Sequence, residues 1–81
     1  MTTESVLTQV NEIFKDILEN DQLNIQNKTT ADDVEEWDSL SHIQLIVAIE
    51  KYYQIRFTTS EINNFKNVGE MCDGIVIKKA N

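Results

Sequence analysis

The sequence predicts an all-α protein, a small four-helix bundle made of three main helices and a short third element. Three observations favour this fold class. Apolar residues recur at three- and four-residue intervals in several segments. No segment alternates apolar and polar residues for long enough to predict a strand. The chain has 81 residues, which suits a single domain over residues 1–81 stabilised by local helical contacts.

The first predicted helix runs from about residue 3 to residue 18. We expect Thr3 to cap it, and Glu4 complements the positive end of the helix dipole. The apolar face of this helix holds Val6, Leu7, Val10, Ile13, Phe14, Ile17 and Leu18. A long polar connection, residues 19–38, follows; a loop of this length is usually functional or packed over the surface. Its expected anchors in the core are Leu23, Ile25 and Val34.

The second predicted helix begins at Asp38, a strong N-cap residue, and ends near Tyr53. At about 100° per residue its apolar residues fall into two groups. The first group is expected to face the core and contains Leu45, Ile46, Ile49 and Tyr53. The second group, here called the apolar patch, lies roughly opposite and contains Leu40, Ile43 and Val47. The apolar patch is either a docking surface or a contact beneath the long loop, and the pattern alone favours neither.

Two shorter elements are expected after the second helix. Residues 56–67 have room for one or two helical turns, capped by Thr58, Thr59 or Ser60. Asn67 and Glu70 then resemble a capping box that opens a last helix. Its apolar face holds Val68, Met71, Cys72 and Ile75. Gly69 and Gly74 each cost this helix about 1 kcal/mol relative to alanine, so its stability should depend on packing.

Charge and composition exclude several functions. The chain has 14 acidic and 7 basic residues, a net charge of −7, which disfavours nucleic-acid binding and favours basic partners. No apolar run is long enough to span a membrane, and no secretory leader is recognisable. A single cysteine forms no internal disulfide, so we expect a cytoplasmic protein. The acids before the second helix, Asp32, Asp33, Glu35, Glu36 and Asp38, lack the spacing and the glycine of a calcium loop.

No arrangement of residues typical of catalysis or metal binding is recognisable in the sequence. His42 is the only histidine, and no Ser-His-Asp or metal-ligand spacing surrounds it, so we expect it to be packed or half-exposed. Cys72 is expected to be a buried apolar residue, and Trp37 and the Tyr52-Tyr53 pair are expected to pack. The sequence therefore predicts that the chain is not an enzyme and holds no metal.

The segment Asp38-Ser39-Leu40 lies where the acidic run meets the second helix. If Asp38 is the cap, Ser39 is the first helical residue and its hydroxyl faces solvent. A phosphate esterified to Ser39 would then lie against free backbone N–H groups and the positive end of the helix dipole. Leu40 would anchor the turn or contact a partner. Taken alone, however, Asp-Ser-Leu is common at helix starts.

The short acidic chain, the long first helix, the long loop and Asp38-Ser39-Leu40 together resemble the acyl carrier protein family. The resemblance covers nearly the whole chain, most closely residues 36–53, and continues to Val68-Gly69-Glu70. It implies an acyl-carrier helical bundle in which Ser39 receives a 4′-phosphopantetheine arm from coenzyme A through a phosphopantetheinyl transferase. The arm's thiol would hold an acyl or aminoacyl group as a thioester for delivery to partner enzymes, and the carrier itself would not catalyse.

The resemblance also implies docking of acyl-loading and acyl-transfer enzymes, with basic surfaces, at the start of the second helix. The expected docking residues are Leu40, Ile43, Val47, Glu36 and Glu50. Gln44 and Lys51 stand where carriers of fatty-acid synthesis frequently have acids, and Trp37 and Ser41-His42 are more similar to specialised, polysaccharide, peptide or polyketide carriers.

Three further expectations concern the cargo, the oligomeric state and an alternative function. An apolar acyl group is expected to shelter between the second and third elements, near Ile46, Ile49, Ile62 and Phe65. We expect a monomer. The alternative function is an unmodified acidic helical interaction module that uses the apolar patch as an adaptor.

Overall fold

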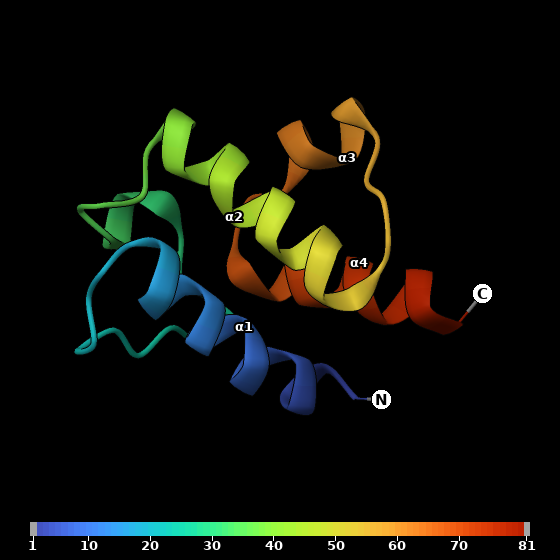
Figure 1. The fold of residues 1–81 in the computed structure, drawn as a ribbon, viewed down its shortest axis with the longest axis horizontal. Helices are drawn as coiled ribbons and strands as arrows, with labels where there is room; N and C mark the ends of the chain where they lie inside the picture. The colour runs from blue at the N-terminus through green and yellow to red at the C-terminus, as the bar shows by residue number, and fades with distance from the viewer. Residues whose placement is uncertain (1, 81) are drawn as a thin grey trace.

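The computed structural model describes residues 2–80 and confirms the predicted all-α fold. Its helices are α1 (Thr3–Ile17), α2 (Ser39–Tyr53), the short α3 (Thr59–Asn64) and α4 (Val68–Ala80). A 3-10 turn, η1 (Ala31–Asp33), interrupts the long connection between α1 and α2, and no strand occurs among the described residues. α1 packs against both α2 and α4. In the view of Figure 1, α3 lies on the opposite side of α2 from α1.

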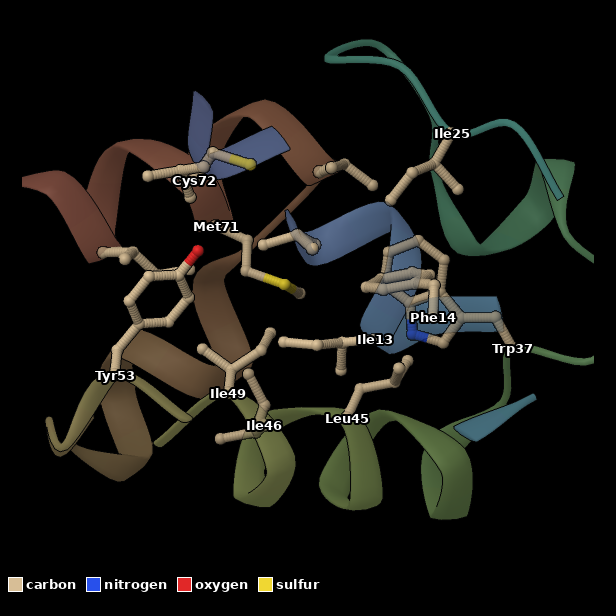
Figure 2. Packing of buried hydrophobic residues seen from close by; sticks show 14 of the residues in the cluster. Ile13, Phe14, Ile25, Trp37, Leu45, Ile46, Ile49, Tyr53, Met71 and Cys72 are labelled. Atoms are coloured by element: carbon tan, nitrogen blue, oxygen red, sulfur yellow. The ribbon is translucent and has the colours of Figure 1, made fainter. Parts of the chain in front are cut away.

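One hydrophobic core fills the space between the helices (Figure 2). Its buried residues are Val6, Val10, Ile13, Phe14 and Leu18 at α1; Ile25, Val34 and Trp37 from the connection; Leu45, Ile46, Ile49 and Tyr53 of α2; Phe57; and Val68, Met71, Cys72 and Ile75 of α4. The predicted core faces of α2 and α4 are therefore confirmed. Leu7, Ile17 and Leu23 pack against this core but stay partly exposed.

The start of α1 corrects the predicted cap. The N-cap is Thr2 rather than Thr3: the Thr2 hydroxyl accepts from the Ser5 backbone N–H at 3.1 Å, and the Ser5 hydroxyl accepts from the Thr2 N–H at 3.2 Å. The Thr3 hydroxyl instead donates to the Asp73 carboxylate of α4 at 3.1 Å. Both threonines are good caps by residue type, but only Thr2 has a polar partner three residues on, Ser5, and Thr3 is bonded to α4.

The long connection packs against the start of α4. The backbone N–H of Val68 donates to the Thr29 carbonyl at 2.9 Å, and that of Gly69 donates to the Asn27 carbonyl at 2.8 Å. A Cβ at residue 69 would lie 2.9 Å from the Asn27 carbonyl oxygen. The absence of a side chain at Gly69 thus permits the close approach of the two backbones. The sequence-based prediction considered only the cost of this glycine to helix stability.

The caps of the two C-terminal helices agree in part with the sequence. Thr58 caps α3 in a capping box with Glu61. At α4, the Glu70 N–H donates to the Asn67 side chain at 2.9 Å, as a capping box requires. The Glu70 carboxylate, however, accepts from the Lys66 N–H at 3.2 Å instead of from Asn67. Only half of the predicted capping box is therefore formed.

Candidate functional site

The candidate site begins at the N-terminus of α2, where Asp38 and Ser41 form a reciprocal capping box. The Asp38 carboxylate accepts from the Ser41 N–H at 2.9 Å, and the buried Ser41 hydroxyl accepts from the Asp38 N–H at 2.7 Å. The Ser41 hydroxyl donates to the Glu36 carbonyl at 3.0 Å. Hydrogen bonds from Ser41 lower the pKa of Asp38 below its ordinary value, because they stabilise the carboxylate. The helix start is therefore fixed from both sides.

This cap makes Ser39 the first residue of α2 and leaves its side chain exposed. The first backbone N–H groups of a helix have no acceptor within the helix, and the dipole there is positive. A phosphodiester on the Ser39 oxygen would suit this position. The sequence predicted Asp38 as the cap but missed Ser41, since serine three residues after a cap is a weaker signal than glutamate or glutamine.

A groove of about 510 Å³, here called the Ser39 groove, runs from Ser39 between the start of α2 and α3. Its apolar lining comes from Trp37, Ile43, Ile62 and Phe65. Its polar lining includes Asp38, His42, Asn63 and Lys66. Mostly apolar walls with a few polar groups suit the binding of a flexible organic group, so the residues present fit a phosphopantetheine arm on Ser39.

The position of this groove corrects the expected shelter for an acyl group. Ile62 and Phe65 line it as predicted. Ile46 and Ile49, in contrast, are 1% and 0% exposed and belong to the closed core. Both side chains point from α2 into the core (Figure 2).

His42 is packed and hydrogen-bonded on both ring nitrogens. The Trp37 indole Nε1–H donates to His42 Nδ1 at 3.1 Å, and His42 Nε2 lies 3.1 Å from the Ile62 carbonyl oxygen of α3. Trp37 is itself buried, with its ring edge-to-face against Phe14 at a centroid distance of 5.0 Å. Both rings therefore pack as the sequence predicted, but nothing in the sequence pattern predicted the bond between them.

The apolar patch on α2 is exposed. Leu40, Ile43 and Val47 are 70%, 51% and 42% exposed, so the hypothesis that they pack beneath the long loop is wrong. The two acids predicted to accompany them have partners within the fold. Glu36 accepts from the Asn20 side chain at 2.8 Å, and Glu50 accepts from the Phe57 N–H at 2.8 Å. Their role in docking stays a prediction.

The remaining candidate residues do not assemble into a second site. Cys72 is buried as predicted, and burial raises the pKa of its thiol to about 12. Tyr53 is buried, whereas Tyr52 is 57% exposed. Among the described residues, no group of His, Cys, Asp and Glu side chains is placed to hold a metal ion. Within residues 2–80 no helix has both the length and the apolar character needed to cross a membrane.

An acidic helical bundle with an exposed serine at the start of its second helix, beside a groove that fits a flexible arm, defines a carrier domain of the phosphopantetheine type. Residues 8–75 match the family model described as "Phosphopantetheine attachment site". An acyl carrier protein from Acidothermus cellulolyticus is 29% identical over 75 residues, which cover 93% of this chain and 89% of that protein. The solution structure of a holo acyl carrier protein from Geobacter metallireducens superimposes with a TM-score of 0.88 and 37% identity, over 93% of this chain and 86% of that one.

The chain belongs to the acyl carrier protein family. Its function is that of an acyl carrier with a covalently attached 4′-phosphopantetheine, as the resemblance in the sequence implied. An unmodified adaptor is not favoured, because the matching family is defined by attachment of the arm.

Proposed function

We propose that Ser39 is the residue that carries the 4′-phosphopantetheine arm, with Asp38 and Leu40 shaping the site around it. The observation that supports this most directly is the position of Ser39, exposed at the first turn of α2 and lining a groove that fits the arm. When attached, the arm supplies a thiol that holds the acyl group as a thioester. The residues of this chain supply the attachment point, the helix terminus that tolerates the phosphodiester, and the groove.

Attachment requires a partner enzyme, which we propose is a phosphopantetheinyl transferase acting on coenzyme A. The Ser39 oxygen forms a bond to the phosphorus on the pantetheine side of the coenzyme A diphosphate, and the bond between that phosphorus and the bridging oxygen breaks. Adenosine 3′,5′-bisphosphate leaves, and the hydroxyl proton is released. Asp38 does not serve as the base in this proposal, because its carboxylate accepts the Ser41 N–H and its pKa is lowered.

We propose that partner enzymes dock on the start of α2 through charge and apolar contact together. The acids of residues 32–38 attract a basic surface and speed encounter. The apolar patch supplies the short-range contact, since its three side chains lie on the face of α2 that bears Ser39 and are 42–70% exposed. Glu50 extends the acidic surface along α2.

We further propose that residues 1–81 form one domain that acts as a monomer in the cytoplasm and performs no catalysis itself. The groups best suited to chemistry are committed elsewhere: both His42 ring nitrogens are hydrogen-bonded, and the Cys72 thiol is buried and held protonated. Light scattering after size-exclusion chromatography tests the monomer.

Intact mass tests the attachment site. Incubation with coenzyme A and a broad-specificity phosphopantetheinyl transferase should add one phosphopantetheine to the wild-type chain and none to Ser39→Ala. Ser41→Ala is the matched control, because it removes a neighbouring hydroxyl and should still be loaded. Loading of Ser39→Ala, or an unchanged wild-type mass with several active transferases, would refute the assignment.

A further inference from the structure

Within residues 2–80, His42 is the only side chain that links the connection before α2 to α3 by hydrogen bonds on both sides. Because Nδ1 accepts from the Trp37 indole N–H, the neutral imidazole carries its proton on Nε2 and donates it to the Ile62 carbonyl. The two ring planes lie within 22° of each other, which aligns the indole N–H with the lone pair of Nδ1. The bond thus fixes both the tautomer and the orientation of the imidazole.

Helix α3 has few polar contacts that could fix its position, although Ile62 packs partly against the core. It has six residues, none of them buried. On the side of α4, Glu61 forms an ion pair with Lys78 at 3.0 Å. On the side of the Ser39 groove, the Ile62 carbonyl receives the His42 Nε2–H, and Ile62 itself lines the groove. The hydrogen bond from His42 is therefore the polar contact that joins α3 to the start of α2.

We propose that His42 is a positioning residue whose neutral, Nε2-protonated form holds α3 against the start of α2 and so sets the width of the Ser39 groove. This inference rests on the proposed function, because the groove matters only if Ser39 carries the arm. It assigns His42 no proton transfer to or from Ser39, since neither ring nitrogen is free.

Three variants of the holo protein separate positioning from general stability. His42→Phe keeps an aromatic ring but removes both hydrogen bonds. His42→Gln offers an amide oxygen to the Trp37 N–H and an amide N–H to the Ile62 carbonyl, so it should restore the link in part. Lys78→Met removes the ion pair between α4 and Glu61 of α3. Lys78 does not line the Ser39 groove, so this variant is the matched control.

Two measurements are needed: amide hydrogen exchange of residues 59–64, and the position of the Trp37 indole N–H resonance in each variant. We expect His42→Phe to speed exchange in α3 about tenfold, as the loss of two hydrogen bonds of ordinary net strength predicts, and His42→Gln to speed it less. The indole resonance should shift in His42→Phe, because its acceptor is lost, and should keep its wild-type position in Lys78→Met.

An indole resonance at the same position in the wild type and His42→Phe would overturn the proposal, and so would equal α3 exchange in these two proteins. If His42→Phe does not fold, α3 exchange in His42→Gln decides the question, since a link restored only in part should leave that exchange faster than in the wild type. Loading at Ser39 is measured separately by mass. Failure of wild-type loading therefore contradicts the proposed function, whereas normal loading with unchanged α3 exchange contradicts only the role of His42.

Discussion

Replacement of Val47 by glutamate tests whether partners bind the apolar patch. Val47 is 42% exposed, so docking removes at most that fraction of the side chain from water. Complete burial of a valine contributes about 1.5–3 kcal/mol, so the lost apolar contact is worth about 0.6–1.3 kcal/mol. Placing a carboxylate against an apolar surface without a hydrogen-bond partner adds about 1–3 kcal/mol. The sum, about 1.6–4.3 kcal/mol, predicts that kcat/KM for phosphopantetheinylation falls by about 15-fold to 1,000-fold, since each 1.4 kcal/mol is a factor of ten.

The assay is the initial rate of loading by a transferase at carrier concentrations well below saturation, read by intact mass. Gln44→Glu is the matched control, because it adds the same charge to an exposed position of α2 three residues away. Added acidity should leave the rate of loading by a basic partner unchanged or raise it. The folded state should be little affected by Val47→Glu, with a loss below about 1 kcal/mol, or a melting temperature lowered by less than about 8 °C.

Each result has a definite meaning. A wild-type rate for Val47→Glu would place docking away from the apolar patch. An equal loss of rate in Val47→Glu and Gln44→Glu would mean that negative charge, and not apolar contact, is responsible. Unfolding of Val47→Glu would show that this side chain belongs to the core.

Three further predictions concern stability and reactivity. Gly69→Ala should lower the free energy of unfolding by about 1–2 kcal/mol in urea titrations, because the new Cβ would lie 2.9 Å from the Asn27 carbonyl oxygen. The control is Gly74→Ala, whose nearest neighbours are ring carbons of Phe65 and Phe57 and whose stability should stay within about 1 kcal/mol of the wild type. A stabilised Gly69→Ala would contradict the argument. Burial raises the pKa of Cys72 to about 12, so only about one thiol in ten thousand is ionised at pH 8 in the folded chain. Cys72 should therefore resist iodoacetamide in the folded apo chain and react in denaturant. Rapid alkylation of the folded chain would be inconsistent with its burial. The pKa of Asp38 is lower in the folded chain than its ordinary value of 3.8, so its carboxylate stabilises the fold above that value, and the contribution is lost as the pH falls through the folded pKa. Asp38→Asn, which still caps the helix, should therefore lose less stability than the wild type between pH 7 and pH 3, and an identical loss would show that Asp38 contributes nothing.

The sequence was sufficient where structure depends on residues close together in the chain. The periodicity of α2 separated Leu45, Ile46 and Ile49 from the apolar patch, and the structure buries the first set and exposes the second. Asp38 was recognisable as a cap for the same reason, since capping involves residues within one helical turn. The family resemblance rested on Asp38-Ser39-Leu40 in this local context, and the matched family model agrees with it.

Contacts between distant residues were decided only by the tertiary structure. The Thr3 hydroxyl, which was expected to cap α1, bonds instead to Asp73, 70 residues away. Gly69 is needed because the loop backbone at Asn27 crosses the start of α4, and a helix-propensity argument does not include that neighbour. Ile46 and Ile49 were expected to line the shelter with Ile62 and Phe65, but the way in which α2 packs on its neighbours turns them into the core instead. The link from Trp37 through His42 to α3 spans 25 residues, so no pattern within one helical turn could predict it. Local patterns therefore specify the helices and Ser39, the proposed attachment site. The shape of the groove beside Ser39, in contrast, follows from the packing of helices that the chain brings together only when it folds.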